Sequence, residues 1–433
     1  MLDATMWRDL DIRPFRHRPP FIACNMLAAK WGISVLVALT GVPPDRLTHA
    51  RRQWTFLQLG RAAEQFGLPL MVTTPAEFQP HRRWIGGRLY RADDEGSPWT
   101  CAEIPLSRHA VVYDAMYLSD LQLFRSSFHP LRHALHGLEV PVFNPVLPPK
   151  DTVYRALSGR PLKGGGLPET RYDLSPNGVL QLFKSVPQWW LKPVYGSGGR
   201  NILFVQRLKP GRYLVSGERF FGQRLVGEVN RRELKRILCQ AMERRRYMAQ
   251  QHIPLITSSD GRKVDFRVTV QRNETGAWQI TAITARLSAK GSMLTNYHAG
   301  GAVQSLTRSS EEDLAWMTRQ GIRDIPFEHA QEFALRVAKR LQQKYPLLGS
   351  LGVDVGQSVE GEWYVYDCNG RPGRDILTDQ EVEAFVHSVA GFAKYLLEHP
   401  RRRSTHCHPL DDKLASIGAQ SPSLWYNENT GDS

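Results

Sequence analysis

Two apolar segments joined by a short polar turn constrain the fold of this chain most. The segments "LGVDVG" (351–356) and "WYVYDCNG" (363–370) are typical of strands, and the turn "QSVEGE" between them suits an antiparallel pair. Residues two apart on a strand point the same way, so Asp367 and Asn369 share a face, and pairing would bring Asp354 to them. The sequence therefore predicts three oxygen-bearing side chains in one cluster on a sheet.

Oxygen ligands without a histidine or cysteine suit Mg²⁺, which takes few protein ligands and fills its other positions with water and substrate phosphates. Two neighbouring carboxylates repel each other unless a cation or an arginine neutralises them. Arg371 and Arg374 follow directly in the sequence. The alternative to a metal site is therefore a surface ion-pair cluster of these carboxylates and arginines.

A glycine-rich loop follows a second predicted strand. In "WWLKPVYGSGGRNILFV" (189–205) the strand delivers Lys192, and the loop Gly196–Gly199 separates it from the next strand. Glycines let backbone N–H groups approach phosphate oxygens closely, and a lysine adds a positive charge. The loop is not a Walker A motif or a dinucleotide fingerprint, because neither Gly-Lys-Ser/Thr nor a helix follows it. The alternative is a hairpin turn with a solvated lysine.

A third segment, "KVDFRVTV" (263–270), alternates charged and apolar residues, which predicts a strand with one polar face. That face carries Lys263, Asp265 and Arg267. The following segments "ITARLSAK" and "TNYHAGG" add Arg286, Lys290 and Asn296. A solvated sheet face is the alternative, but positive charge beside an acidic metal cluster suits a triphosphate that bridges the two.

The chain has 433 residues, which is too long for one compact core. Up to about residue 145, segments such as 51–75 alternate helix and strand patterns, which predicts an open α/β sheet. The Gly- and Pro-rich stretch 147–170 indicates a boundary, and an α+β pattern follows it. We predict an N-terminal α/β domain (1–145), a second domain (146–398) and a polar, poorly ordered tail (399–433).

The net charge of +14 and the isoelectric point near 9.7 favour acidic partners, among them nucleic acid, anionic polymers and nucleotide phosphates. No zinc finger, RNP motif or basic zipper accompanies the charge, so nucleic acid is the less favoured alternative. The longest apolar run (32–42) is about half of a membrane span, and the N-terminus has acids where a signal peptide is basic. We predict a cytoplasmic protein without a membrane partner.

The five cysteines are widely spaced and predict neither a disulfide framework nor a four-cysteine zinc site. Cys368 lies between two of the predicted metal ligands on the opposite face of the strand, which favours a packed thiol over a nucleophile. The "HCH" motif (406–408) lies in the polar tail without a partner motif, so we interpret it as incidental.

These segments, in this order, resemble the ATP-grasp superfamily and more closely its YheC/YheD branch, named as endospore coat-associated proteins. The matching text covers about residues 110–395 and runs as "FNP", "LPPKDTVYRAL", "LPET", "LKPVYGSGGRNI", "YMAQQHIPL", "VDFRVTVQ", "TARLS", "TNYHAGG" and "LGVDVGQSVEGEWYVYDCNGRPG". The resemblance implies an ATP-grasp fold, in which two α+β subdomains clasp ATP, preceded here by the open α/β domain.

The resemblance also implies roles for individual residues. Those expected to hold the nucleotide are Lys150 and Lys192 at the phosphates, Gly196, Ser197, Gly198 and Gly199 as the lid, Gln250, Gln251 and Ile253 at the adenine, and Asp265 near the ribose or phosphates. Those expected to act on the reacting groups are Arg286, Asn296, Arg267 and Arg371, with Arg371 directed at the anionic substrate. The expected metal ligands are Asp354, Asp367 and Asn369, which would hold one or two Mg²⁺ ions, or Mn²⁺ in their place.

The function that the resemblance implies is an ATP- and Mg²⁺-dependent carboxylate–amine ligase that forms an amide through an acyl phosphate. The expected partners are ATP, a carboxylate substrate such as an acidic peptide or protein, and spore coat proteins. Two positions differ from the usual pattern of the family: Asp367 stands where Glu is common, and Gln250-Gln251 where Glu-Lys is common. A non-catalytic, nucleotide-binding coat or scaffold protein is the main alternative, and a nucleic-acid-binding protein is the other.

Overall fold

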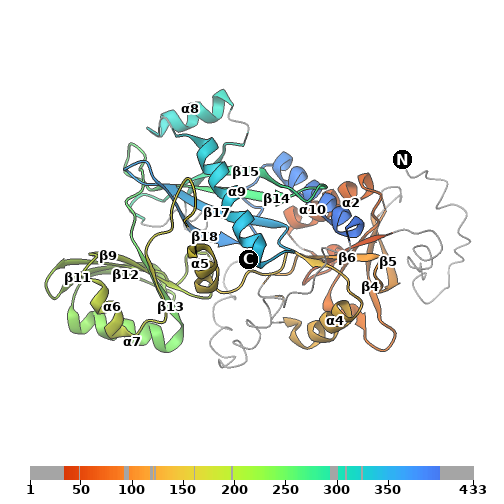
Figure 1. Cartoon of the computed structure of the whole chain (residues 1–433), viewed down its shortest axis with the longest axis horizontal. Coiled ribbons are helices and arrows are strands. Elements are labelled where there is room, and N and C mark those ends of the chain that lie inside the picture. The colour runs from red at the N-terminus through yellow and green to blue at the C-terminus, as the bar shows by residue number, and fades with distance from the viewer. Residues whose placement is uncertain are drawn as a thin grey trace, which may run out of the picture.

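The computed structural model describes residues 34–399, with some exceptions. It does not describe residues 48, 92–96, 118–119, 121–122, 160, 197, 293–300, 308–309 and 323–324, nor the side chains of 125, 218 and 219. Three β-sheets organise this part of the chain, and helices cover their faces (Figure 1). No helix in the described ranges is both long and apolar enough to cross a membrane. Apart from His399, the predicted tail and its "HCH" motif lie outside the described residues.

The first sheet combines parallel and antiparallel strands in the order β3-β4-β2-β1-β6-β7, with β5 paired to β4. Its strands are β1 (Val35–Leu39), β2 (Leu70–Thr73), β3 (Phe78–Gln79), β4 (Trp84–Tyr90), β5 (Trp99–Pro105), β6 (Ala110–Asp114) and β7 (Val142–Phe143). The parallel strands β1, β2, β6 and β7 match the predicted alternation with helices. The sequence predictions omit the antiparallel hairpin β4–β5.

Helices cover both faces of the first sheet. Helix α2 (Ala50–Gln65) and helix α10 (Asp379–Glu398) share one apolar core with it, in which Phe56 and Leu59 of α2 pack with Phe385 and Phe392 of α10. Helix α4 (Arg125–Gly137) packs on the other face through Leu131 and its apolar neighbours. The predicted helix in segment 51–75 is therefore present, and the last helix of the described chain completes the core of its first sheet.

The second sheet is antiparallel in the order β12-β11-β10-β9-β13-β8. Its strands are β8 (Thr170–Arg171), β9 (Gln188–Pro193), β10 (Leu203–Lys209), β11 (Arg212–Phe220), β12 (Gln223–Asn230) and β13 (Tyr247–Gln251). Helices α6 (Pro176–Leu182) and α7 (Arg231–Arg244) cover one face, where Leu234 and Leu238 pack with Trp189 and Leu191. Strand β12 is absent from the sequence predictions, because every side chain in it is at least partly exposed and no apolar alternation marks it.

The third sheet is antiparallel in the order β16-β15-β14-β17-β18. Its strands are β14 (Val264–Arg272), β15 (Trp278–Leu287), β16 (Ala302–Ser305), β17 (Ser350–Gln357) and β18 (Trp363–Asn369). Helix α9 (Phe327–Lys344) packs on the apolar face, where Phe333 and Val337 join Phe266 and Val268 in one core. Helix α5 (Lys150–Ser158) lies beside α9, and helix α8 (Glu311–Arg319), which the sequence predictions omit, precedes it.

Asn144 ties the end of the first sheet to the third. Its φ of 60° is in the left-handed region, and its side chain is buried. The side-chain Nδ2 donates to the carbonyl of Gly370 at 2.9 Å, and Oδ1 accepts from the backbone N and the hydroxyl of Ser350 at 2.9 and 3.0 Å. Since Gly370 directly follows the predicted metal-ligand strand, Asn144 fixes the chain at the end of β18.

We expect the variant Asn144→Ala to lower the free energy of unfolding by about 2–4 kcal/mol, because it leaves buried groups of Gly370 and Ser350 unsatisfied and puts a Cβ-bearing residue without a polar side chain at a positive φ. Chemical denaturation followed by tryptophan fluorescence measures the change. The variant Asn144→Gly loses the same hydrogen bonds but tolerates the positive φ, so it should lose less. Equal denaturation midpoints for wild type and Asn144→Ala would contradict the assignment.

Candidate active site

Lys192 joins the second and third sheets. It lies on β9, and its Nζ donates to Oε1 of Gln250 on β13 at 2.6 Å and to the carbonyl of Tyr366 on β18 at 3.1 Å. The side chains of β9 alternate, so Lys192 points away from the face that α6 and α7 cover. The lysine therefore occupies the space between the two sheets, and its contact with phosphates stays a prediction.

Burial and the nearby charge of Lys150, against the opposing effects of Asp367 and Asp354, together lower the pKa of Lys192 to about 8. Within the described part of the chain, both hydrogen-bond partners of this ammonium are neutral oxygens. A buried cation held only by neutral groups is costly and is best stabilised by an anion. The alternative of a solvated lysine on a hairpin turn does not agree with this burial.

A second lysine meets the predicted metal ligands. Lys150 is the first residue of α5, its backbone N donates to the carbonyl of Val194 at 3.1 Å, and its Nζ lies 2.5 Å from Oδ1 of Asp367. The same carboxylate oxygen accepts from the backbone N of Cys368 at 3.0 Å. The loop after β9 and strand β18 thus place Lys150, Lys192 and Asp367 around one space.

The polar face of β14 is an ion-pair network and is not solvated. Asp265 accepts two hydrogen bonds from Arg286 at 2.6 and 2.8 Å, and Asp354 accepts two from Arg267 at 2.7 and 2.9 Å. A further contact of 3.1 Å joins Arg286 to Asp354. Burial acts to raise the pKa of Asp354, but the two guanidinium groups outweigh it and hold that pKa below its usual value.

The arginines that neutralise Asp354 are therefore Arg267 and Arg286, whereas the ion-pair alternative named Arg371 and Arg374. Arg371 forms its ion pair with Asp114 at the end of β6, and its guanidinium nitrogens are buried. Burial raises the pKa of Asp114 above its usual value, although the charge of Arg371 opposes this effect. The side chain of Arg371 thus links the first sheet to the turn after β18, and its direction toward a substrate stays a prediction.

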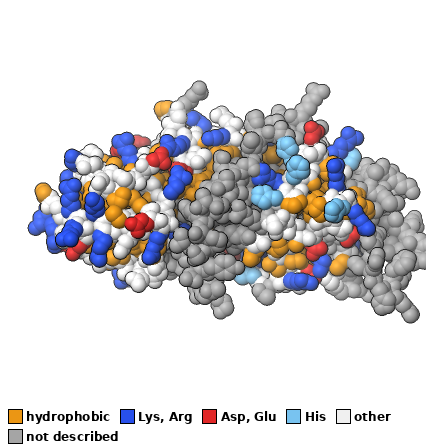
Figure 2. All heavy atoms as spheres, turned by 90° about the horizontal axis from the view of Figure 1, so that it is seen from below, with side chains coloured by type: hydrophobic (Ala, Val, Ile, Leu, Met, Phe, Trp, Pro, Cys, Tyr) orange, Lys and Arg blue, Asp and Glu red, His pale blue; other side chains and the backbone are white. Residues whose placement is uncertain are grey.

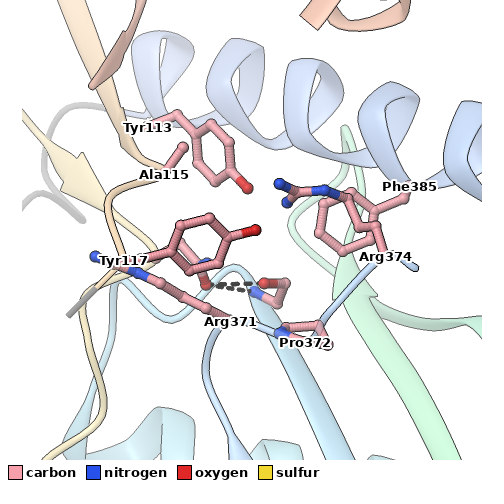
Figure 3. Close-up of a pocket in the computed structure, with 9 residues that line it drawn as sticks. Tyr113, Ala115, Tyr117, Arg371, Pro372, Arg374 and Phe385 are labelled. Atoms are coloured by element: carbon pink, nitrogen blue, oxygen red, sulfur yellow. Dashed lines mark hydrogen bonds between the residues drawn. The ribbon is translucent and has the colours of Figure 1, made fainter. Parts of the chain in front are cut away.

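A small pocket lies beside Arg371. Figure 3 shows Tyr113, Tyr117 and Arg374 pointing toward a common space, with Arg371 and Phe385 at its edge. Burial acts to lower the pKa of Arg374, but the neighbouring tyrosines outweigh it and raise that pKa above its usual value. The pocket lies between residues of β6, the turn after β18 and α10, so the first sheet contributes side chains next to the predicted ligand strand.

The predicted metal ligands have the expected register. Asp354 pairs with Asp367 across β17 and β18, and Gly352 pairs with Asn369. The side-chain oxygen of Asn369 accepts from the backbone N of Arg371 at 2.9 Å. In the described ranges no three His, Cys, Asp or Glu side chains are grouped so that they could hold an ion. The donor set fits Mg²⁺ in its chemistry, since it contains oxygen atoms only.

The remaining predicted residues lie as follows. Gln250 contacts the hydroxyl of Thr170 at 3.4 Å through Nε2, the backbone N of Gln251 donates to the carbonyl of Glu169 at 2.8 Å, and Ile253 lies just beyond β13. Gly196, Gly198 and Gly199 all have positive φ, at 146°, 67° and 72°, in the loop after β9. Ser197 and Asn296 lie outside the described residues.

The sequence predictions miss an aromatic cluster beside Lys192. Trp190 donates from Nε1 to Nδ1 of His252 at 3.0 Å, and Phe204 packs against both rings. Burial lowers the pKa of His252 to about 4, with a smaller effect of Lys263, so the imidazole is uncharged at neutral pH. Trp190 and Lys192 are two residues apart, which puts both on the same face of β9. This spacing could have predicted an aromatic ring beside the lysine.

Cys368 is a packed thiol, as expected. It contacts the core of the third sheet, and burial raises its pKa well above the usual value, followed by the charges of Asp367 and Asp354. A thiol that resists ionisation is a poor nucleophile. Cys101 and Cys239, also described, are free as well.

We expect the pH dependence of stability to report the buried Lys192. Between pH values of about 8 and 10.5 the unfolded chain holds a proton on this lysine that the folded chain has lost, so the stability of the wild type rises with pH in that window. Relative to Lys192→Met, the wild type should gain about 2 kcal/mol in free energy of unfolding between about pH 7 and pH 10. Denaturation curves of the nucleotide-free proteins at both pH values measure the gain.

The exposed Lys209 offers a matched control. Lys209→Met removes the same charge from an exposed position on β10, so it measures what the loss of one surface charge does at each pH. If the stability difference between the wild type and Lys192→Met does not change with pH, the assignment of Lys192 as a lysine with a lowered pKa is wrong.

A second prediction concerns the Asp114–Arg371 pair. Arg371→Gln leaves the buried carboxylate of Asp114 without its cation, and we expect a loss of about 3–5 kcal/mol in free energy of unfolding. The double variant Asp114→Asn, Arg371→Gln removes both charges and should recover more than half of that loss. If Arg371→Gln unfolds at the denaturant concentration of the wild type, the arginine has no role in joining the two sheets.

Two curated proteins are similar to most of this chain. The chain is 24% identical to the endospore coat-associated protein YheD of Bacillus subtilis (strain 168) over 337 residues, which cover 76% of this chain and 69% of YheD. It is 21% identical to the endospore coat-associated protein YheC of the same organism over 318 residues, or 73% of this chain and 84% of YheC.

One similar solved structure is a RiPP-associated ATP-grasp ligase of Chryseobacterium gregarium in complex with ADP and a leader and core peptide. Its sequence is 13% identical and the TM-score is 0.44. The match covers 86% of this chain and 99% of that one. The family model described as YheC/D-like ATP-grasp matches residues 139–397, more than half of the chain. The predicted superfamily, branch and fold are thereby confirmed: the chain belongs to the YheC/D-like ATP-grasp family.

Proposed function

We propose that this protein is an ATP- and Mg²⁺-dependent ligase that joins a carboxylate to an amine through an acyl phosphate. The observation that carries the proposal is the half-buried ammonium of Lys192, which lies between two sheets and has only neutral hydrogen-bond partners in the described chain. Three further cations belong to the same site: Lys150 at the start of α5, Arg267 on β14 and Arg286 on β15. Together these four cations exceed the three carboxylates that they contact, so the space between the sheets favours an anion.

Lys150 and Lys192 would bind the phosphates of ATP. Lys150 now contacts Asp367, and a phosphate that replaced this carboxylate as its partner would leave Asp367 for a metal ion. Gln250 holds Lys192 from β13 and would fix the direction of its ammonium. The glycines Gly196, Gly198 and Gly199 could bring backbone N–H groups close to the same phosphates, since their positive φ values exclude bulky side chains.

Asp354, Asp367 and Asn369 are the residues that would hold Mg²⁺, or Mn²⁺ in its place. When bound, the ion would neutralise charge on the phosphoryl group that is transferred. Asp354 is shared with Arg267 and Arg286, so the phosphates of ATP would compete with this carboxylate for the two guanidinium groups. The two arginines would then bind the phosphates of ATP in place of Asp354, and the strands would not need to move.

The proposed reaction needs no covalent intermediate on the protein. A substrate carboxylate oxygen attacks the γ-phosphorus, and the bond from that phosphorus to ADP breaks. An amine then attacks the carbonyl carbon of the acyl phosphate, loses a proton and displaces phosphate. Arg286 and Arg267 would stabilise the negative charge that develops on the transferred group, and alignment between the two sheets supplies the rest of the acceleration.

The substrates that we propose are a carboxylate on a peptide, a protein or an anionic polymer, and an amine. The curated relatives are named as endospore coat-associated proteins, so coat proteins of a developing spore, inside the cytoplasm of the cell that makes it, are the partners we favour. The scaffold alternative keeps the nucleotide site and lacks turnover. Its distinguishing property is ATP binding that no carboxylate converts into ADP release.

The test is ADP formation by the full chain with Mg²⁺ and a panel of carboxylates, peptides and acidic proteins. We expect ADP release that depends on the added carboxylate and falls at least about a hundredfold in two variants. Lys192→Met removes a positive charge at the phosphates, and Asp367→Asn removes a carboxylate that would hold the metal ion. Lys209→Met, which changes an exposed lysine on β10, is the control and should keep full activity.

Stoichiometric ATP binding without turnover across the panel would favour the scaffold protein and overturn the ligase. The nucleic-acid alternative predicts salt-sensitive binding of RNA or DNA without ATP, which filter binding at low and moderate salt measures.

A further inference from the structure

The positive charge of this chain is concentrated on one subdomain. Residues 170–251, which span the second sheet and helices α6 and α7, contain 16 lysines and arginines against five acids. Their net charge of +11 is most of the +14 of the whole chain. Charge that looks diffuse along the sequence thus gathers in space, and Figure 2 shows many Lys and Arg side chains over the end of the molecule that this subdomain forms.

Helix α7 carries the densest part of this charge on its outer face. The exposed residues Arg231, Arg232, Lys235 and Arg236 form no ion pair within the described part of the chain, and we call them the α7 basic face. Like charges four residues apart repel, as do cations and the positive end of the helix dipole at the first turn. The capping box of Asn230 and Glu233 offsets some of that repulsion. These positive charges therefore destabilise the isolated helix, which indicates that a negatively charged partner binds them.

The free edge of strand β12 runs directly into this face. Strand β12 is the last strand of the second sheet and pairs only with β11 among the described strands. All of its side chains are at least partly exposed, Val226 among them at 52%. Asn230 is both its last residue and the N-cap of α7. An unpaired strand edge binds an extended polypeptide through backbone hydrogen bonds, which a nucleic acid cannot supply.

We propose that the β12 edge and the α7 basic face form a docking surface for an acidic, extended polypeptide. The peptide would add a strand beside β12 and place its carboxylates against the arginines and the lysine of α7. The face lies on the opposite side of the second sheet from Lys192, so a docked chain leaves the space between the sheets open. The inference goes beyond the ligase chemistry, because docking requires neither ATP nor turnover.

The first test is fluorescence anisotropy of a labelled oligoglutamate of about twenty residues with the full-length protein, without ATP. The quadruple variant Arg231→Gln, Arg232→Gln, Lys235→Gln, Arg236→Gln keeps good helix formers, and we expect it to weaken binding at least about tenfold. A matched variant removes four exposed charges elsewhere, by Arg82→Gln, Arg319→Gln, Lys339→Gln and Lys344→Gln, and should bind within about twofold of the wild type.

Equal losses in the two variants would overturn the docking surface, since net charge alone would then explain binding. An oligouridylate of about the same length is the second probe. Tighter binding of the oligouridylate than of the oligoglutamate, lost in the α7 variant, would assign the face to nucleic acid and overturn the proposal.

The second test is hydrogen exchange with and without the oligoglutamate. Strand addition predicts slower exchange of amides in β12 (Gln223–Asn230), with no change in β5 (Trp99–Pro105), a strand at the edge of the first sheet. Binding that leaves the β12 amides unprotected would overturn the strand-pairing part of the proposal.

Discussion

Two salt bridges across neighbouring strands set the arrangement on which the rest of the site depends. Asp265 lies directly opposite Arg286 in the register of β14 and β15, and Arg267 lies directly opposite Asp354 in the register of β14 and β17. Each pair is bidentate, the first fully and the second partly buried. A slip of one residue in either pairing would turn these charges toward the apolar core, where an unpaired ion is very costly. The network therefore fixes the register of three strands, and β17 in turn fixes where β18 presents Asp367.

The sequence was sufficient for the features that depend on local patterns. The β17–β18 hairpin, the shared face of Asp354 and Asp367, and the lysine before the glycine loop all follow from the strand period and a short turn. The partners of these residues were not predictable in the same way. Which arginine reaches Asp354 depends on the sheet order β15-β14-β17, and this brings together segments about 70 to 90 residues apart.

Edge strands and contacts between sheets were missed for related reasons. Strand β12 has no buried side chain, so no apolar alternation marks it, and its pairing with β11 is a property of the hairpin as a whole. Arg371 stands next to the predicted ligands in sequence, yet its guanidinium contacts Asp114 of the first sheet. Nothing in the local pattern tells a ligand-binding arginine from one that joins two sheets, because both are buried cations beside a carboxylate.

The position of α10 has a consequence for the synthesis of the chain. Phe385 and Phe392 of this last helix fill the core between α2 and the first sheet, although that sheet is built from residues 35–143. A ribosome finishes the strands of the first sheet about 240 residues before it makes the helix that covers them. The second sheet, by contrast, lies within 170–251 and can close from neighbouring segments. We therefore expect the middle of the chain to fold first. The nascent N-terminal sheet keeps an exposed apolar face until α10 is made, and a chaperone would bind it in that state.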